Sequence, residues 1–275
     1  EVNHTNAEAT HSQIAYASED SPPTLVASEL LGRATDRSIT VNAVASGDLE
    51  VCFDYGTAPS EYSHRTVPEF FPGGEPIEVV IDNLQADTRY FYRMCYRSPG
   101  DGEFILGDEH TFHTQRSPGS TFVFAVEADP HLDDQSSPDL YARTLYNILQ
   151  DSPDFLVDLG DTFMSGKLPI INYEEISRRH LLLRSYFDLV CHSTPLYLVL
   201  GNHEGEQGWM LDGTSENLAV WATQVRKEYY PNPVPDGFYA GNGQLEDFVG
   251  LRENYYAWEW GDALFVVLDP YWYTP

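Results

Sequence analysis

Asp, His and Asn side chains occur in three short clusters in the middle of the chain, each directly after an apolar run. The clusters are Ala128-Asp129-Pro130-His131, Gly160-Asp161-Thr162 and Gly201-Asn202-His203-Glu204. Carboxylate, imidazole and amide groups suit Mn, Zn or Fe as ligands, and a carboxylate can bridge two cations. Two cations about 3.5–4 Å apart can clamp a phosphoryl group and generate hydroxide at neutral pH. The clusters therefore indicate half of a two-metal site.

The apolar runs before the clusters predict the strands that position them. These runs cover Phe122–Val126, Asp154–Asp158 and Pro195–Leu200. They are continuous and rich in β-branched and aromatic residues, which is typical of strands buried in a mostly parallel sheet. Open α/β sheets place ligands at the carboxyl ends of their strands. We therefore expect the three clusters to lie together at that edge.

The ordered set D-x-H, G-D and G-N-H-E resembles the calcineurin-like metallophosphoesterase family. The resemblance implies that Asp129 and His131 ligate a first metal, that Asp161 bridges both metals and that Asn202 ligates the second. It implies a catalytic role for His203, which would contact the substrate phosphate and help the leaving group depart. The implied cofactors are two divalent or trivalent metal ions, with Mn, Zn and Fe as candidates. The implied reaction is hydrolysis of a phosphomonoester or phosphodiester by metal-bound hydroxide, and the substrate-binding residues stay unassigned.

Two departures from family patterns affect this interpretation. Met164 stands where purple acid phosphatases place a tyrosine ligand, so we expect a PhoD-like or broader phosphoesterase arrangement. The family completes its second metal with later histidines, whereas no histidine follows His203. The apolar strand predicted at Ala263–Leu268 would also lack a neighbour. We therefore expect the missing C-terminal half of the domain, continuing past Pro275, or a second chain to complete the site.

Residues 23–115 predict an all-β sandwich of the fibronectin III/Ig-like class, because short strands alternate with turn signals. The strands are expected at Leu25–Leu31, Ser38–Val44, Leu49–Tyr55, Pro76–Ile81, Thr88–Arg97 and Leu106–Thr114. The segment Asn83–Tyr90 resembles the tyrosine-corner loop of fibronectin type III domains, in which the tyrosine hydroxyl bonds back to the chain. Tyr90, Tyr92 and Met94 should then face the core.

The predicted fold class is multi-domain: an N-terminal sandwich, then an α/β metallophosphoesterase domain that forms the first half of an αββα sandwich. The boundaries are a polar N-terminal tail at 1–22, the sandwich at 23–115 and the α/β domain at 121–275, incomplete at its C-terminus. Helices are expected at Ser137–Gln150, Glu174–Val190 and Asn217–Tyr229, and a hairpin at Asn254–Trp260 and Ala263–Asp269. In the first helix, Leu140, Leu145, Ile148 and Leu149 should lie near one face.

Several Cys and His residues outside the clusters have structural interpretations. If their strands are neighbours, Cys52 and Cys95 face one another, and both a disulfide and a pair of packed thiols stay open. Cys191 is expected to be buried at a helix end. His180 and His192 do not follow a strand's carboxyl end, so we expect neither to act at the site.

The charge of the chain argues against some partners. The net charge is −28, the pI is about 4.3, and only Lys167 and Lys227 are lysines. Such a surface repels nucleic acid and anionic membranes, so no nucleic-acid binding is expected. No apolar run approaches the length of a membrane span. Glu1 resembles a processed end, which favours an extracellular, periplasmic or cell-surface protein.

Two functions stay open at this stage. The leading one is a metal-dependent phosphoester hydrolase acting on a phosphate ester. The alternative is a non-enzymatic surface or assembly protein that reuses an inactive, half-length phosphoesterase fold. The aromatic loops Gly205–Gly213 and Pro231–Gly243 leave the same sheet edge, and they either line a substrate pocket or form surface loops.

Overall fold

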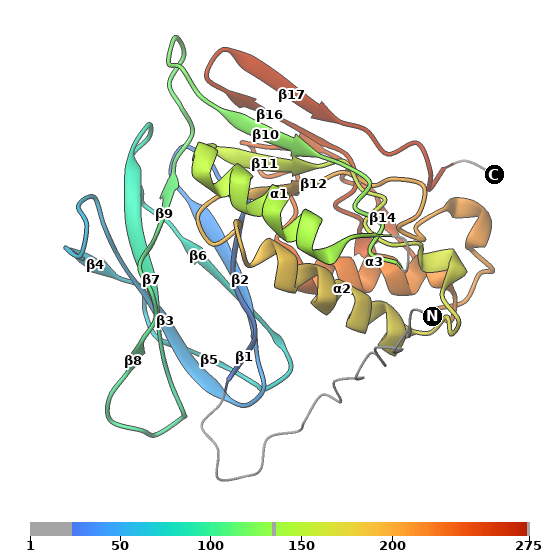
Figure 1. The fold of residues 1–275 in the computed structure, drawn as a ribbon, viewed down its shortest axis with the longest axis horizontal. Helices are drawn as coiled ribbons and strands as arrows, with labels where there is room; N and C mark the ends of the chain where they lie inside the picture. Colours follow the sequence, from blue (N-terminus) through green and yellow to red (C-terminus); the bar gives the residue numbers. More distant parts are fainter. Residues whose placement is uncertain (1–23, 134–135, 274–275) are drawn as a thin grey trace, which may run out of the picture.

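A computed structural model describes residues 24–133 and 136–273. The predicted tail at 1–22 lies outside these residues. The described chain forms a β-sandwich that packs beside a layered α/β region (Figure 1). No helix in the described ranges is both long enough and apolar enough to cross a membrane.

The sandwich consists of two antiparallel sheets, as predicted. One sheet contains β1 (Leu25–Gly32), β2 (Ile39–Ala45) and β6 (Pro76–Ile81). The other is centred on β3 (Leu49–Gly56) and β7 (Arg89–Arg97), with the short strands β4 (His64–Arg65), β5 (Glu69–Phe71), β8 (Ile105–Leu106) and β9 (His110–His113). The single strand expected at Leu106–Thr114 is therefore two short strands.

The tyrosine corner of the sandwich is confirmed. The Tyr90 hydroxyl accepts a hydrogen bond from the backbone N–H of Gln85 at 2.8 Å. Tyr90, Tyr92 and Met94 are all buried in the core between the sheets. This contact closes the turn before β7, so that the inward-facing residues of β7 meet those of β3.

The two cysteines on β3 and β7 face one another directly. Cys52 and Cys95 are partners in the strand register, and both are free thiols. The Cys95 thiol donates to a carboxylate oxygen of Asp54 at 3.4 Å. The structure thus shows the packed-thiol alternative.

The α/β region is built in three layers. The central sheet is parallel and contains β10 (Phe124–Glu127), β11 (Phe155–Asp158) and β12 (Leu196–Leu198). The helices α1 (Pro138–Asp151), α2 (Tyr173–Phe187) and α3 (Leu218–Tyr229) lie on one side of it. The antiparallel sheet of β13 (Ala240–Gly241), β16 (Tyr256–Trp260) and β17 (Ala263–Val267) lies on the other (Figure 1). Shorter elements are η1 (Ser165–Lys167), η2 (Gly208–Met210), β14 (Leu245–Glu246) and β15 (Gly250–Leu251).

Packing on both faces explains why β11 is apolar without alternation. Phe155 meets the rings of Trp258 and Phe265 edge-on at centroid distances of 5.7 and 5.2 Å. The next residue, Leu156, belongs to the core shared with the helices, which includes Leu145. A strand with neighbours above and below needs apolar side chains at every position. The predicted two-sided burial is therefore confirmed for β11.

Two details of the predicted packing are wrong. β10 lies at the edge of the sheet, and its Phe124 and Val126 side chains are 43% and 51% exposed. In α1, Leu140 is 62% exposed, whereas Tyr141 and Leu145 are buried. At about 100° per residue, Leu140 lies about 140° around the helix from Leu145, so the two cannot share a narrow face.

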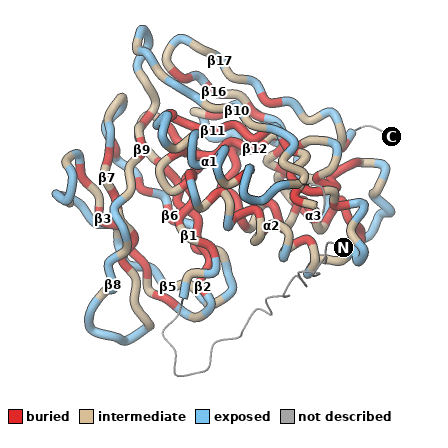
Figure 2. Tube along the Cα trace, viewed as in Figure 1, coloured by how far each residue is buried: buried red, intermediate tan, exposed pale blue. Residues whose placement is uncertain are grey.

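The sandwich docks on the helices through a buried arginine. Arg184 on α2 donates to the Asn42 side-chain oxygen on β2 and to the backbone oxygen of Tyr229, both at 2.6 Å. It also donates to the backbone oxygen of Ser28 on β1 at 2.6 Å. β2, the central strand of its sheet, is buried along its whole length (Figure 2). Because the guanidinium satisfies carbonyls from both regions, it fixes their relative position.

The two histidines expected to be structural pack against other rings, and one of them is buried. His180 is buried, and its ring meets those of Phe163 and Tyr230 edge-on at 5.0 and 5.6 Å. Burial lowers the pKa of His180 to about 3. His192 packs on the ring of His110 at 4.3 Å. Cys191, just after α2, is fully buried as expected.

Candidate metal centre

Backbone hydrogen bonds continue beyond the strand ends and join the three clustered loops. The N–H of Asp129 donates to the backbone oxygen of Gly160 at 3.0 Å, and that of His131 to the backbone oxygen of Asp161 at 3.2 Å. The N–H of Ser165 donates to the backbone oxygen of His203 at 3.0 Å. The loops therefore form one connected unit at the carboxyl edge of the parallel sheet.

Three of the predicted metal ligands come together there. Possible ligand atoms of Asp129, His131 and Asp161 all lie within 4.8 Å of one another. The His131 Nε2 atom is 3.3 Å from an Asp129 carboxylate oxygen. All three residues have positive φ, at 57°, 40° and 55° respectively. Such angles are uncommon outside glycine and are concentrated at functional sites. The turns that they produce aim the three side chains at one point.

The third loop adds His203 to this group. The backbone N–H of His203 donates to Asp161 Oδ1 at 2.9 Å, and the His203 ring meets the His131 ring edge-on at 5.5 Å. Asn202 precedes it with an exposed side chain, and its backbone oxygen accepts a hydrogen bond from Gln207. Across residues 24–133 and 136–273, no contact joins the Asn202 amide to the cluster. The structure therefore gathers four of the five predicted site residues and places the fifth next to them in the chain.

Two glycines are required for the loops to approach so closely. A Cβ atom on Gly201 would lie 2.3 Å from Asp161 Oδ1. A Cβ atom on Gly160 would lie 2.3 Å from the backbone nitrogen of Gly201, and Gly160 has a φ of 85°. Real Cβ contacts are not this short, so any side chain would push the loops apart. Steric crowding thus explains why the G-D and G-N-H-E patterns begin with glycine.

Glu204 connects the second and third loops through its carboxylate. Its carboxylate accepts hydrogen bonds from the backbone N–H of Thr162 at 2.9 Å and from that of Gly201 at 2.6 Å. Burial raises the pKa of Glu204 to about 8. The sequence motif contained this residue but gave it no role. Its function in holding the loops becomes visible only when its burial and partners are known.

Two further carboxyl groups, one half-buried and one buried, lie at the strand ends before the clustered loops and were not predicted. Glu127 and Asp158 are register partners at the ends of β10 and β11. Tyr141 donates to Glu127 at 3.0 Å, and the backbone N–H of Gly160 donates to Asp158 at 2.8 Å. Burial raises the pKa of Glu127 to about 7, and burial together with Glu127 raises the pKa of Asp158 well above its usual range. A cation beside these groups would favour their ionised forms.

The donor set fits a transition-metal cation. Two carboxylates and an imidazole suit Mn, Zn or Fe better than they suit a softer ion. The Nδ1 atom of His131 is buried and has no hydrogen-bond partner among the residues that the structure describes. A buried imidazole nitrogen without a partner is an unusual feature that a ligand would resolve.

A cleft opens beside the cluster. It has a volume of about 1100 Å³, and Asp129 and His131 form part of its lining. We call it the metal-edge cleft. None of the aromatic residues of the loops 205–213 and 231–243 lines it, and Trp209 is 52% exposed. The aromatic residues of these loops therefore do not line the metal-edge cleft.

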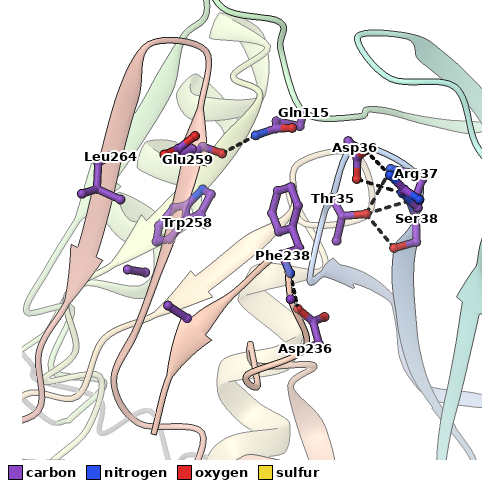
Figure 3. A pocket seen from close by; sticks show the side chains of 13 residues that line it. Thr35, Asp36, Arg37, Ser38, Gln115, Asp236, Phe238, Trp258, Glu259 and Leu264 are labelled. Carbon is purple, nitrogen blue, oxygen red and sulfur yellow. Dashed lines mark hydrogen bonds and ion pairs between the residues drawn. The ribbon is translucent and has the colours of Figure 1, made fainter.

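A second cavity of about 770 Å³ lies between the turn after β1 and the β16–β17 hairpin (Figure 3). Thr35 and Asp36 line it from the sandwich, and Phe238 and Trp258 from the α/β region. Its lining includes no residue of the metal cluster. It is thus separate from the candidate site.

The fold of the chain is similar to the folds of known proteins. The structure is similar to that of PhoD, with a TM-score of 0.65 and 14% sequence identity over 90% of this chain and 52% of that one. It is also similar to a purple acid phosphatase from yellow lupin (Lupinus luteus) seeds, with a TM-score of 0.58 and 14% identity over 89% of this chain and 44% of that one. The chain thus spans about half the length of these two structures, and identities this low show a shared fold alone. No curated protein sequence matched the chain.

The family comparison covers the whole metal cluster. The sequence model of the calcineurin-like phosphoesterases matches residues 122–266, which is more than half of the chain. This range contains β10, β11, β12 and the three loops that follow them. The predicted fold class, a β-sandwich followed by an α/β metallophosphoesterase domain, is confirmed. The chain belongs to the calcineurin-like phosphoesterase family.

Proposed function

We propose that the protein is a metal-dependent phosphoester hydrolase that acts at the cluster of Asp129, His131 and Asp161. The observation that carries this proposal is the convergence of their ligand atoms within 4.8 Å at the carboxyl edge of the parallel sheet. Membership of the calcineurin-like phosphoesterase family supports the same reaction class.

Each residue of the cluster has a proposed task. Asp129 and His131 would hold one cation, Asp161 would be shared between two, and Asn202 would join the second. Bound cations would polarise the phosphoryl oxygens and lower the pKa of water at the site. His203 would hydrogen-bond a phosphate oxygen and protonate the departing alcohol. Its backbone bond to Asp161 keeps its imidazole beside the ligands.

The number of ligands has a further consequence. Asp129, His131 and Asp161 give one cation three protein ligands, whereas a second cation would have a shared carboxylate and one amide. Metals of this kind are usually held by three or four protein ligands. We therefore propose that the second cation takes further ligands from protein segments outside the described residues, either on the same polypeptide or on a partner.

Hydrolysis of two chromogenic esters tests the proposal. The protein would be stripped with a chelator, reloaded with Mn²⁺, Zn²⁺ or Fe²⁺, and assayed with 4-nitrophenyl phosphate and bis(4-nitrophenyl) phosphate. We expect turnover of at least one ester, loss on chelation and recovery on reloading. Asp139→Asn, which changes an exposed carboxylate on α1, is the matched control for Asp129→Asn. Failure of every metal to support turnover would favour the non-enzymatic alternative.

A further inference from the structure

The metal-edge cleft combines positive charge with apolar walls in a strongly acidic protein. The chain has 15 basic and 43 acidic residues. Two of the basic residues, Lys167 and Arg179, line the cleft that also contains Asp129 and His131. We propose that the cleft binds the alcohol part of a phosphoester, and that Lys167 and Arg179 pair with a second anionic group on that alcohol. The inference rests on the proposed function, because it concerns the substrate of the same site.

Lys167 is available to a ligand. It is exposed at the end of η1, and in the described part of the chain no acidic side chain pairs with it. The other lysine, Lys227, is engaged, because its ammonium donates to the backbone oxygen of Val249 at 2.7 Å and lies 3.8 Å from Glu253. An unpaired ammonium beside a cleft forms a strong, charge-assisted hydrogen bond with an anionic ligand at no cost to an existing pair.

Arg179 also retains positive charge. Its Nε atom donates to Glu175 at 3.0 Å, but the same carboxylate accepts two hydrogen bonds from Arg178 at 2.8 and 2.7 Å. One carboxylate therefore compensates two guanidinium groups. The carboxylates that line the cleft are those of Asp129, which we assign to the metal cluster, and Asp133. Lys167 and Arg179 thus place two cationic side chains in the lining of one cleft, in a chain of net charge −28, where they can pair with an anionic group of a ligand.

The rest of the lining is suited to an apolar or aromatic group. It comes from the segment after the second ligand loop and from α2, and includes Phe163, Met164, Leu168, Leu182 and Tyr186. The volume of about 1100 Å³ is at the upper end of ligand sites and exceeds the needs of a phosphate group. The expected substrate class is therefore a phosphoester whose alcohol joins an apolar segment to an additional carboxylate or phosphate.

Two non-hydrolysable probes of equal length test the inference. Hexylphosphonate and 6-phosphonohexanoate differ in a terminal carboxylate, and their affinities for the full-length, metal-loaded protein would be measured by calorimetry. We expect the carboxylate to tighten binding about tenfold, as one desolvated charge pair would. In the double variant Lys167→Gln/Arg179→Gln, the ratio of the two dissociation constants, hexylphosphonate over 6-phosphonohexanoate, should fall to about one. The affinity for hexylphosphonate itself should stay within about twofold of wild type. Arg143→Gln, which changes an exposed arginine on α1 outside the cleft, should retain the ratio.

The outcomes separate this inference from the proposed function. A ratio near one in the wild type, or a ratio that survives the double substitution, overturns the inference. Turnover of 4-nitrophenyl phosphate without discrimination between the probes overturns the inference alone. If the protein distinguishes the two probes through Lys167 and Arg179 but hydrolyses no ester, the inference about the cleft is supported and the proposed hydrolase function is contradicted.

Discussion

At the scale of single residues, backbone geometry contributes as much to the site as side-chain chemistry. Asp129, His131 and Asp161 all have left-handed φ angles, which L-residues adopt at a cost of about 1–3 kcal/mol each. The hydrogen bonds between the loops and the buried carboxylate of Glu204 hold these angles in place. The three side chains are therefore held close together by the fold of the loops.

The role assigned to His203 gives a prediction at this scale. His203→Ala should lower kcat by about 10²–10⁴-fold, because an acid or charge-stabilising group is lost from beside the phosphate. Metal content should stay as in the wild type, since the backbone N–H that reaches Asp161 is retained. Elemental analysis and steady-state kinetics on the same preparation measure both effects. Loss of metal together with activity would show that His203 is a ligand and not an acid.

The residues of the site divide into those that sequence can reveal and those that it cannot. Asp129, His131, Asp161 and His203 follow a strong ordered motif, and the structure gathers them. Their metal and catalytic roles stay predictions. Glu127 and Asp158 look like ordinary strand-end residues in the sequence, because their significance comes from burial and from their pairing in the register.

At the scale of elements, a local contact at the start of β7 stabilises the β-sandwich. Tyr90→Phe should lower the free energy of unfolding by about 0.5–1.5 kcal/mol, because the hydrogen bond between the hydroxyl and the backbone N–H of Gln85 is lost while the ring packing stays. Urea denaturation followed by fluorescence measures this change. Tyr96→Phe on the same strand is the control and should change stability by less than about 0.5 kcal/mol. Equal effects of the two substitutions would mean that the corner contact adds nothing.

The elements were predictable wherever local pattern and tertiary burial agree. The parallel strands, the three helices and the C-terminal hairpin follow apolar runs, caps and the Gly261-Asp262 turn, and Asn217 caps α3 with its side chain. The errors concern exposure. Phe124 on β10 and Leu140 on α1 are apolar but exposed, because among the described residues β10 is an edge strand and Leu140 lies on the outer side of its helix. Sequence periodicity does not show which face of an element has a partner.

At the scale of the whole molecule, acid should destabilise the fold through His180. Its pKa is about 3 in the folded protein against about 6.5 in the unfolded chain, so it is neutral where it is buried. Its contribution to stability is complete above pH 6.5 and is lost as the pH falls from 6.5 towards 3, by up to about 1.4 kcal/mol per pH unit. His180→Gln should reduce the slope of unfolding free energy against pH in that window.

The matched control for this slope is His64→Gln, which replaces an exposed histidine of the sandwich. Denaturant unfolding of the three proteins at pH values between 4 and 7 gives the comparison. An equal slope of unfolding free energy against pH in wild type and His180→Gln would contradict the prediction. It would mean that the His180 ring is protonated in the folded state while it stays packed against Phe163 and Tyr230.

The most direct test of the account is the metal content of the protein with and without the shared carboxylate. Wild-type protein, Asp161→Asn and the surface control Asp139→Asn would be loaded with Mn²⁺ or Zn²⁺, dialysed and measured by elemental analysis. Asp161 has a possible ligand atom within 4.8 Å of those of Asp129 and His131, and its carboxylate accepts a hydrogen bond from the backbone N–H of His203. We expect bound metal in the wild type and in Asp139→Asn, and none in Asp161→Asn, because the amide loses the charge and one ligand oxygen. Equal metal in all three proteins, or none in the wild type, would contradict the assignment of this cluster as the metal centre.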